Sequence, residues 1–596
     1  MDSKIKDQIL AATNSKRIES TELIQKLWND YGDLLRIYLS GGEYNSVILK
    51  HIKIPDNQNH PKGFSGDISR KRKINSYLVE TNWYENYNHT NFLDNHSKTA
   101  KKLKTFQSGG EFFILLEDLD ASGYSKRLEA PEFKEIKLVL SWLASFHAKF
   151  MNITQADLWE TGTYWHLETR PDELVKLQDK KLKEFAPLID SKLSSAKYQT
   201  LVHGDAKLAN FCFSDDLESV AAVDFQYVGN GTGVRDVAYF IGSCMDEVEC
   251  KKNESEILDY YFNELRCFSD LDECQHAELE SEWRELYPYA WADFHRFLKG
   301  WSPDHWKINN YSEKLKNQVI SKIEDDLLSS MKSACIEAGK IIMSYYKSDF
   351  EISKKEGSTL SSSVVTEVDI KSQKCILENL VQTINTYDLG VLSEEKNDDG
   401  SRLVKDFFFA IDPLDGTYFF SRDAPGFSVS IALVGREGEA TVGVIYDPVG
   451  NTLVHAIKDR GCYINDKIHK VEAGIGSNKK IRLFADQSQK DAINIKTLED
   501  SFEIEYTGGA VINSLNVLTT KNSTYFKYPK KEKGGCAIWD LAAIDIIFKE
   551  ANASITSFDG EKLSFNSDES HYFNKEGLMV CHNEEILKKI KEMKCE

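Results

Sequence analysis

The sequence predicts two domains, each built from both helices and strands. The chain has 596 residues, of which 41% are hydrophobic, and a single hydrophobic core stops growing at about 250–300 residues. A polar, charged stretch at residues 312–326 lies near the middle of the chain. Helical and strand-like patterns occur on both sides of it. We therefore predict one domain at residues 1–318 and a second at residues 319–596.

The first half is predicted to begin with strands and to continue mainly as helices. Residues 36–53 alternate like two paired strands around the turn SGGEYNSV, and residues 111–119 form a short apolar run with strand character. Helices are predicted at residues 72–87 and 132–151. The apolar side of the helix at 72–87 is expected to contain Ile74, Tyr77, Leu78 and Tyr84.

The second half is predicted to begin with an amphipathic helix at residues 327–346. Its apolar face would contain Leu327, Met331, Ala334, Cys335, Ala338, Ile341 and Ile342. Strand-like runs follow at residues 407–411, 428–434 and 440–446, and a helix is predicted at residues 540–550.

Charge and composition limit the possible partners. The formal net charge of −20 argues against a nucleic acid polymer, which the field of the whole protein would repel. The charged first twenty residues lack the apolar core of a signal peptide, and no stretch approaches the ~20 apolar residues of a membrane span. The 11 cysteines form no CxxC pair, as expected of reduced thiols. We therefore expect a cytoplasmic protein without a membrane partner; the oligomeric state stays unknown.

Carboxylates occur in four short motifs of the second half. VTEVD contains Asp369, LSEE contains Glu394 and Glu395, IDPLDGT contains Asp412 and Asp415, and IWDLAA contains Asp540. Mg²⁺ prefers oxygen ligands, and a pair of such ions can clamp the attacking and leaving oxygens of a phosphoryl transfer. Each motif alone also has an ordinary interpretation as a turn, a helix cap or a solvated loop.

The turn in DPLDG would bring metal-binding groups together. Proline and glycine force a turn that lets Asp412 and Asp415 project towards a common point, while the Leu414 carbonyl can turn inward. The amides of Gly416 and Thr417 would hold a phosphate oxygen if they open a helix.

In combination and order, SSSVVTEVD, VLSEE, AIDPLDGTYFF and GGCAIWDLAA resemble the inositol monophosphatase superfamily, from about residue 324 to the C-terminus. The resemblance implies an alternating α/β/α/β/α sandwich. It also implies Mg²⁺-dependent removal of phosphate from an inositol phosphate, a sugar phosphate or 3'-phosphoadenosine 5'-phosphate.

The same resemblance implies two or three Mg²⁺ ions. Glu394, Asp412 and the Leu414 carbonyl would bind one ion. Asp412, Asp415 and Asp540 would bind a second.

It also implies the groups that activate water. Thr417, hydrogen-bonded to Asp369, would orient the nucleophilic water and help to deprotonate it. Glu395 would not bind metal itself but would adjust the properties of Glu394 as a metal ligand.

The substrate of this half stays open between two classes. The lysines of KYPKKEKGGC, residues 527–536, would neutralise a second phosphate, or they form a solvated basic loop. VLSEE and DPLDGTYFF favour the 3'(2'),5'-bisphosphate nucleotidase branch. GGCAIWD, however, departs from the glycine-proline-threonine sequence that is common before the tryptophan in that branch.

The first half contains the motif HGDAKLAN, followed by AAVDFQYVG. An aspartate that accepts a hydroxyl proton and an asparagine five residues later that holds Mg²⁺ have the form of a kinase catalytic loop. With Asp224 at its interval, the pattern resembles the aminoglycoside phosphotransferase and choline kinase group, ecdysteroid-kinase-like branch, over residues 41–306. The resemblance implies an α+β protein-kinase-like fold that transfers phosphate from ATP–Mg²⁺ to a small-molecule alcohol.

Residue roles follow from that resemblance. Asp205 would be the catalytic base, and Asn210 and Asp224 the Mg²⁺ ligands. His203 would brace the loop, and Asp236 would hold it in place.

Further upstream, Lys50 would bind the α and β phosphates with Glu80 as its helix partner. Lys53 is a competing choice for Lys50, and Lys207 would contact the transferred phosphate. The turn SGGEYNS is a candidate for the loop that covers the phosphates.

The alcohol acceptor is the least defined part. Aromatic and acidic residues at 159–166 and 291–301 would form a pocket for a cationic or polycyclic alcohol, or they belong to the core.

We therefore predict a bifunctional protein. A Mg²⁺-dependent phosphomonoesterase that acts on 3'-phosphoadenosine 5'-phosphate or a related small phosphate is joined to an ATP-dependent kinase for small-molecule hydroxyls. The alternative is an inositol or sugar monophosphate phosphatase with a kinase-like nucleotide-binding module that lacks turnover.

Overall fold

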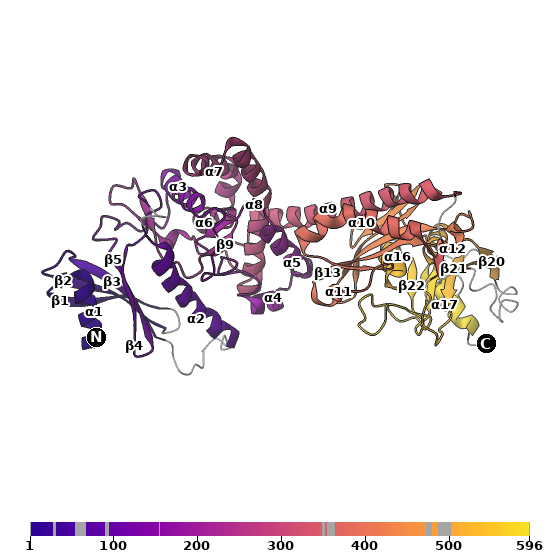
Figure 1. The fold of residues 1–596 in the computed structure, drawn as a ribbon, viewed down its shortest axis with the longest axis horizontal. Helices are drawn as coiled ribbons and strands as arrows, with labels where there is room; N and C mark the ends of the chain where they lie inside the picture. The colour runs from indigo at the N-terminus through magenta and orange to yellow at the C-terminus, as the bar shows by residue number, and fades with distance from the viewer. Residues whose placement is uncertain are drawn as a thin grey trace. The chain divides into compact units, whose positions relative to one another are not determined.

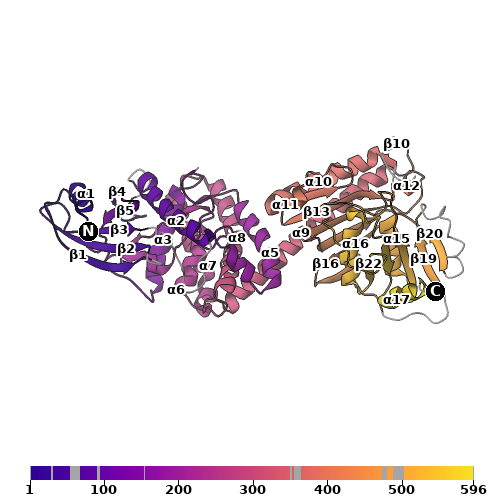
Figure 2. The same ribbon diagram turned by 90° about the horizontal axis from the view of Figure 1, so that it is seen from below.

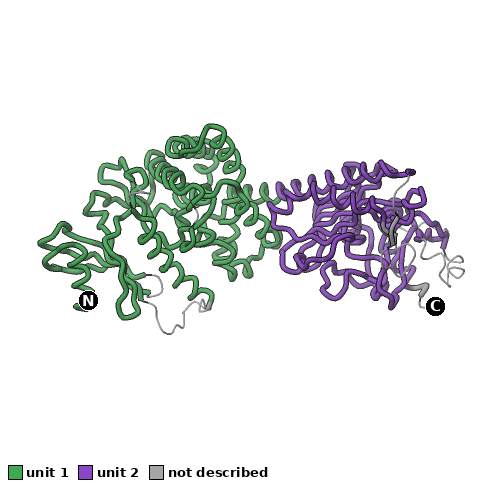
Figure 3. Tube along the Cα trace, in the orientation of Figure 1, with its two compact units in different colours: residues 1–320 green, residues 321–596 purple. Residues whose placement is uncertain are grey.

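The computed structural model describes residues 2–27, 31–53, 67–89, 94–153, 155–348, 352–354, 364–472, 480–486 and 502–594. The chain divides into two compact units, Met1–Ile320 and Ser321–Glu596 (Figure 3). The polar stretch at 312–326 is helical, because α9 runs from Asn310 to Tyr345 through it. Within the described residues, no helix is both long and apolar enough to cross a bilayer.

Unit 1 begins with a five-stranded antiparallel sheet (Figure 1). Its order is β1 (Arg17–Lys26), β2 (Gly32–Ser40), β3 (Ser46–Ile52), β5 (Glu111–Glu117) and β4 (Lys102–Ser108). Helix α1 (Ser3–Thr13) packs Ile5 and Ile9 against one face, where Val47 and Leu49 of β3 are buried. Because side chains alternate along a strand, Ile48 and Lys50 point to the opposite face. The predicted strands are confirmed.

Helix α2 (Asp67–Asn82) and a π-helical turn (Trp83–Tyr87) contribute the predicted helix between β3 and β4. Tyr77 and Tyr84 are buried, as expected, but Leu78 is 38% exposed and its prediction was wrong. The buried side of the helix runs instead through Val79 and Glu80. Glu80 is buried on this helix because its carboxylate pairs with Lys50 of β3 at 2.6 Å.

The rest of unit 1 is mainly helical and contains two small antiparallel strand pairs. The helices are α3 (Phe133–Lys149), α4 (Pro171–Lys176), α5 (Lys180–Ser194), α6 (Val234–Cys244), α7 (Glu247–Phe268) and α8 (Glu273–Trp301). One pair joins β6 (Thr200–Val202) to β9 (Gly229–Gly231), and the other joins β7 (Phe211–Phe213) to β8 (Val220–Ala222). A 3₁₀ turn, Leu208–Asn210, lies between β6 and β7 in the chain. The aromatic ring of Phe225 stacks on Trp83 and lies against His203. These contacts anchor the loops after β6 and β8 to the π-helical turn that follows α2.

Unit 2 contains a seven-stranded sheet. In order, its strands are β12 (Gly390–Ser393), β13 (Phe407–Asp415), β14 (Ser428–Gly435), β15 (Ala440–Asp447), β16 (Thr452–Ile457), β17 (Gly461–Ile464) and β18 (Lys467–His469). Only the pair β12–β13 is parallel. The three strands predicted from residues 407, 428 and 440 onward are confirmed.

Helices cover both faces of this sheet (Figure 2). Cys335 and Gly339 of α9 lie against Val444 and Tyr446 of β15, whereas Gly443 of the same strand lies against α16 (Ile538–Glu550). Since side chains alternate, α9 and α16 occupy opposite faces. Helix α10 (Glu367–Tyr387) packs beside β13 on the α9 side, where Ser372 hydrogen-bonds the Pro413 carbonyl.

A second sheet completes the layers of unit 2. Its order is β20 (Phe502–Tyr506), β19 (Ile481–Ala485), β21 (Ser523–Lys527), β23 (Leu578–Cys581) and β22 (Ser554–Thr556). Helix α15 (Ala510–Thr519) packs beside α16 and on this sheet, and α17 (Glu584–Lys594) buries Ile586 and Ile590 against it with Met579. The order of layers is α/β/α/β/α, as the sequence predicted.

Candidate functional site

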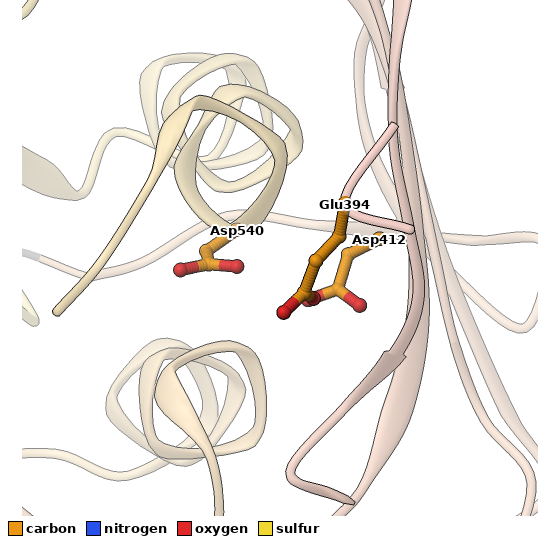
Figure 4. A group of neighbouring side chains, drawn as sticks. All are labelled: Glu394, Asp412 and Asp540. Atoms are coloured by element: carbon orange, nitrogen blue, oxygen red, sulfur yellow. The ribbon is translucent and has the colours of Figure 1, made fainter. Parts of the chain in front are cut away.

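Three carboxylates of unit 2 converge on one point (Figure 4). Side-chain oxygens of Glu394, Asp412 and Asp540 all lie within 4.8 Å of one another. Glu394 follows β12 and donates its amide hydrogen to the Ile411 carbonyl of β13 at 3.2 Å. Because β12 and β13 are parallel, their carboxyl ends meet at one sheet edge. Asp540 enters from the first turn of α16, where it accepts the Ala537 N–H at 2.7 Å.

Asp415 lies near this group and is not part of it. A bulge separates Asp412 from Asp415 in the pairing with β14. Asp415 Oδ2 accepts the Val511 N–H at 3.0 Å, at the start of α15. The structure thus brings together Asp412 and Asp540 of the expected second metal set, with Asp415 bound to a helix start beside them.

The electrostatics of the group favour a bound cation. Burial, and after it the charge of Glu394, raises the pKa of Asp540 to about 7. Burial and the neighbouring carboxylates also raise the pKa values of Asp412 and Asp415 well above their usual range. Buried like charges are costly unless a cation compensates them. Crowded carboxylate oxygens are the donor set that Mg²⁺ prefers, so these residues fit that ion.

A hydroxyl and a carboxylate lie beside the metal-type cluster. Thr417 Oγ1 is 2.9 Å from Asp369 Oδ1 and 2.9 Å from the Leu414 carbonyl oxygen. The other oxygen of Asp369 accepts the Thr366 N–H at 2.7 Å and its hydroxyl at 2.6 Å. Burial raises the pKa of Asp369 to about 7, although the hydrogen bonds from Thr366 lower it. Of the motif SSSVVTEVD, residues 361–363 lie outside the described part of the chain.

The turn that holds Thr417 depends on glycine. Gly416 has a φ of 82°, and a Cβ at this position would lie 2.4 Å from the Gly426 carbonyl oxygen. A single helical turn, α12 (Thr417–Phe420), begins directly after it. The sequence anticipated this helix start, and phosphate binding by its amides stays a prediction.

Two supporting residues were missed by the sequence interpretation. Ser372 Oγ donates to the Pro413 carbonyl at 2.7 Å, and the side-chain oxygen of Gln373 accepts the Glu395 N–H at 3.1 Å. Both residues follow Asp369 by one helical turn on α10, so helical spacing from Asp369 could have found them.

The basic stretch at 527–536 is only partly available to a substrate. Lys527 Nζ lies 2.7 Å from Asp486 Oδ2, which neutralises it. Lys531 is exposed, and the exposed Lys533 lies over the Tyr572 ring at 5.6 Å.

Unit 1 contains a cavity of about 1170 Å³ that gathers the predicted kinase residues. It is lined, among others, by Lys50, Glu80, Asp205, Lys207, Asn210 and Asp224. Lys50 Nζ is 2.8 and 2.6 Å from the two Glu80 oxygens and 3.4 Å from Asp224. Lys53, the competing choice, points to Asp33 at 3.7 Å and does not line the cavity.

The loop after β6 is closed by hydrogen bonds around Asp205. Asn210 Nδ2 donates to Asp205 Oδ2 at 3.0 Å, Lys207 Nζ lies 2.8 Å from the same oxygen, and Tyr239 OH donates to Oδ1 at 3.2 Å. Burial raises the pKa of Asp205. For Asp224, burial favours the neutral form, but Lys50 and Lys207 lower its pKa below the usual range.

Asp236 and His203 hold this loop from behind. Asp236, fully buried on α6, accepts the backbone N–H groups of His203 and Gly204. His203 Nδ1 accepts the Asp205 N–H at 3.2 Å, so its Nε2 donates to the Val223 carbonyl at 3.0 Å. These contacts are of the kind expected from a brace.

The expectation for the loop that covers the phosphates needs correction. The turn SGGEYNS joins β2 to β3 and packs against Ser15 and Lys16, so it does not cover the cavity. Leu27 and Tyr31, which flank the connection from β1 to β2, line the cavity instead. The sequence interpretation did not identify the hairpin of β1 and β2, which contributes these residues.

The aromatic residues proposed for the acceptor pocket lie partly at the cavity and partly in the core. Tyr164 and Trp301 line the cavity, whereas Trp165 and Trp291 are buried in the core. Asp293 pairs with Arg296 at 2.7 Å, so it is no partner for a cationic alcohol.

Comparison with known proteins finds family matches in both parts of the chain. Residues 324–593 match the Inositol monophosphatase family, and residues 160–273 match the Ecdysteroid kinase-like family. Nus factor SuhB of Haemophilus influenzae is 30% identical over 242 residues, which are 38% of this chain and 83% of that protein. Nus factor SuhB of Pasteurella multocida is 29% identical over 272 residues, 43% of this chain and 91% of that protein. A crystal structure of suhB from Bartonella henselae, 23% identical, covers 44% of this chain and 96% of its own, with a TM-score of 0.38.

These matches define a phosphatase-family unit together with a kinase-like module. Through its C-terminal part, the chain belongs to the inositol monophosphatase family. Members of that family are generally Mg²⁺-dependent phosphatases.

Proposed function

We propose that unit 2 is a Mg²⁺-dependent phosphomonoesterase for a small phosphate ester and that unit 1 is an ATP-dependent kinase for a small-molecule alcohol, in a cytoplasmic protein. The observation that carries the phosphatase proposal is the buried group Glu394, Asp412 and Asp540, with Thr417 and Asp369 beside it. Buried acids with raised pKa values beside a hydroxyl–carboxylate pair are typical of an active site.

The residues of unit 2 divide between holding metal and activating water. Glu394, Asp412 and the Leu414 carbonyl would hold one Mg²⁺, and Asp412, Asp540 and Asp415 a second. When bound, the ions supply charge for the phosphate oxygens and make a water more acidic. The Thr417 hydroxyl would orient that water, and Asp369 would receive its proton through Thr417. Glu395 would position Glu394, and the backbone amides of Gly416 and Thr417 would donate hydrogen bonds to a phosphate oxygen.

The substrate class that we favour is a polyol or sugar monophosphate. Among the relatives, Inositol monophosphatase 1 of Saccharomyces cerevisiae is 27% identical and Inositol-1-monophosphatase of Bacillus subtilis is 24% identical. Lys527 is neutralised by Asp486 and is not free to bind a second phosphate. The exposed Lys531 and Lys533 keep 3'-phosphoadenosine 5'-phosphate as the second candidate.

Phosphate release by the purified full-length protein tests this order. Release from inositol monophosphates and from 3'-phosphoadenosine 5'-phosphate would be compared in the wild type and in the Lys531→Gln and Lys533→Gln variants. We expect a higher kcat/KM for the inositol phosphates and no change in the variants. A preference for the nucleotide that these substitutions reduce would assign the second substrate instead.

The kinase proposal rests on the shared cavity of Lys50, Glu80, Asp205, Asn210 and Asp224. The acceptor oxygen would bond to the γ-phosphorus of ATP while the bond to the β-phosphate oxygen breaks, and the hydroxyl proton would pass to Asp205. Lys50 would hold the nucleotide phosphates, Asn210 and Asp224 would hold Mg²⁺, and Lys207 would contact the transferred group.

ATP consumption across a panel of alcohols distinguishes a kinase from a nucleotide-binding module. We expect acceptor-dependent ADP formation by the wild type and none by Asp205→Asn, with ATP binding retained in both. Saturable ATP binding without turnover on any acceptor would favour the module.

A further inference from the structure

One wall of the unit 1 cavity is cationic. It contains Arg72 and Lys73 from α2 and Arg170 from the residue before α4. Arg72 donates to the Thr169 carbonyl at 2.7 Å and to Ser69 Oγ at 3.1 Å. Lys73 donates to the side-chain oxygen of Gln226 at 2.9 Å. Among the described residues, neither Arg72 nor Lys73 has a carboxylate within ion-pair distance, so their formal charges are not neutralised there.

Three other cations that line the cavity are matched by acids. Arg36 pairs with Asp118 at 2.7 Å, and Arg127 pairs with Asp120 at 2.9 Å. Lys207 pairs with Asp205 at 2.8 Å. Arg72 and Lys73 differ from these paired cations, and together with Arg170 they give this wall an excess of positive charge.

Like charges meet on this wall. Burial, and after it the charge of Arg170, lowers the pKa of Arg72. Burial also lowers the pKa of Lys73 to about 8. Arg170 has one acidic partner, Glu173, at 3.3 Å. Holding these cations together costs free energy that an anionic ligand would offset.

Arg170 is held in a fixed orientation. Its Nε donates to the Tyr164 carbonyl at 3.0 Å, and its guanidinium lies 5.6 and 5.5 Å from the centroids of the Tyr164 and Phe297 rings. A planar guanidinium fixed in this way suits the paired oxygens of a phosphate group.

The same contacts connect this wall to the predicted base. Tyr164 OH lies 3.4 Å from Tyr239 OH, which donates to Asp205 Oδ1 at 3.2 Å. Tyr164 thus contacts Arg170 through its carbonyl and reaches towards Asp205 through its hydroxyl. A phosphate group on Arg170 would therefore lie on the side of the cavity from which Tyr164 and Tyr239 approach the predicted base.

We propose that the acceptor is an alcohol that already carries a phosphate group, which Arg72 and Arg170 bind while its free hydroxyl faces Asp205. This inference rests on the proposed kinase function and specifies its substrate class. The new bond joins the acceptor oxygen to the γ-phosphorus, ADP leaves, and the proton passes to Asp205. The product carries one phosphate more than the acceptor. A cationic alcohol is disfavoured, because the wall is positive and Asp293 is engaged by Arg296.

Matched pairs of alcohols test the proposal. All assays use the full-length protein with the Asp540→Asn substitution, so that unit 2 does not hydrolyse the phosphate esters that are added. ADP formation is measured with glycerol and glycerol 3-phosphate, myo-inositol and myo-inositol 1-phosphate, and adenosine and adenosine 5'-phosphate, with choline as the cationic alcohol. Binding of the phosphorylated compounds is measured separately with a non-hydrolysable ATP analogue present.

We expect a phosphorylated member to exceed its partner in kcat/KM by at least about tenfold, the effect of one charge-assisted hydrogen bond. Arg170→Gln should raise the KM for that acceptor by about tenfold or more and leave the KM for ATP unchanged. Arg170→Lys should restore part of the loss because it keeps the charge. Arg266→Gln, which removes an exposed arginine paired with Glu280 at 3.3 Å, is the matched control and should change neither constant.

Better turnover of neutral alcohols or choline would overturn the proposal, as would a rise in the KM for ATP in Arg170→Gln. If no alcohol is turned over, the kinase function fails, and binding decides the inference separately. Binding of phosphorylated alcohols that Arg170→Gln removes would support the anion subsite. Binding unchanged by Arg170→Gln would overturn it.

Discussion

Thr417 Oγ1 lies 2.9 Å from Asp369 Oδ1 and equally 2.9 Å from the Leu414 carbonyl oxygen. A hydroxyl has one hydrogen to donate, so it satisfies only one of these two acceptors at a time. If the hydrogen goes to Leu414, a protonated Asp369 can donate to Thr417, and the pKa of about 7 makes that state accessible at neutral pH. The pair can therefore exchange a proton beside the carboxylate cluster.

Thr417→Val removes the hydroxyl and keeps the shape of the side chain. We expect phosphate release by unit 2 to fall by about 10²–10⁴-fold, the usual contribution of a positioned proton-transfer group. Thermal stabilisation by Mg²⁺ should persist, because the carboxylates remain. Thr383→Val, which removes a hydroxyl hydrogen-bonded to Ser330 at 2.8 Å on the same helix as Asp369, is the control. A Thr417→Val enzyme with wild-type kcat would exclude the proton-transfer role.

Asp540→Asn should stabilise unit 2 when Mg²⁺ is chelated. The pKa of Asp540 rises from 3.8 to about 7 on folding, so its ionisation destabilises the fold. This penalty is absent below the unfolded pKa, grows as the pH rises towards the folded value, and is then constant. A shift of one pKa unit corresponds to about 1.4 kcal/mol, and 1 kcal/mol moves Tm by about 2–4 °C in a unit of this size.

Calorimetry in chelator and in Mg²⁺ measures this effect. In chelator, the Tm of unit 2 in Asp540→Asn should exceed that of the wild type at about pH 8, and the gap should narrow towards about pH 5. Saturating Mg²⁺ should reverse the order, because only the wild type retains the full ligand set. If the variant is less stable than the wild type at every pH in chelator, the ionised Asp540 carboxylate does not destabilise the metal-free fold.

Gly416→Ala should impair unit 2 more than its backbone conformation alone explains. A side chain in the left-handed region costs about 1 kcal/mol, and here the new Cβ also meets the Gly426 carbonyl oxygen at 2.4 Å. Gly400→Ala is the matched control, because Gly400 has a φ of 75° and nothing within 4 Å of its Cβ position. We expect a lower Tm of unit 2 and weaker phosphate release in Gly416→Ala than in Gly400→Ala. Equal values for the two variants would mean that the turn relaxes without cost.

Glu80→Gln should weaken ATP binding by unit 1. Burial disfavours the charged form of Lys50, but Glu80 and Asp224 raise its pKa and keep it charged. Without the Glu80 carboxylate, Lys50 can move towards Asp224, which lies at 3.4 Å. We expect the KM for ATP to rise by about tenfold, as measured by ADP formation. Glu256→Gln, which breaks an exposed pair with Lys137 at 3.0 Å, should leave it unchanged; equal KM values in both variants would contradict the role of Glu80.

The sequence predicted most strands and helices because their apolar periods match the burial. The expected pairs Lys50–Glu80 and Asp369–Thr417 are within hydrogen-bond distance, which motif spacing on known elements could indicate. Leu78 was misplaced because the buried side of the helix runs through Val79 and Glu80, and an apolar period gives no sign that a glutamate is buried. The cationic wall of Arg72, Lys73 and Arg170 joins residues about a hundred positions apart, which sequence separation hides.

The most direct test is Mg²⁺-dependent phosphate release from an inositol monophosphate by wild type, Asp540→Asn and Asp545→Asn. Asp545 lies on the same helix, pairs with Lys549 at 2.6 Å and is not one of the three clustered acids. We predict release by the wild type and Asp545→Asn that rises with Mg²⁺, and none by a folded Asp540→Asn. Undiminished release by Asp540→Asn, or release by the wild type in chelator, would contradict a metal-dependent site at Glu394, Asp412 and Asp540.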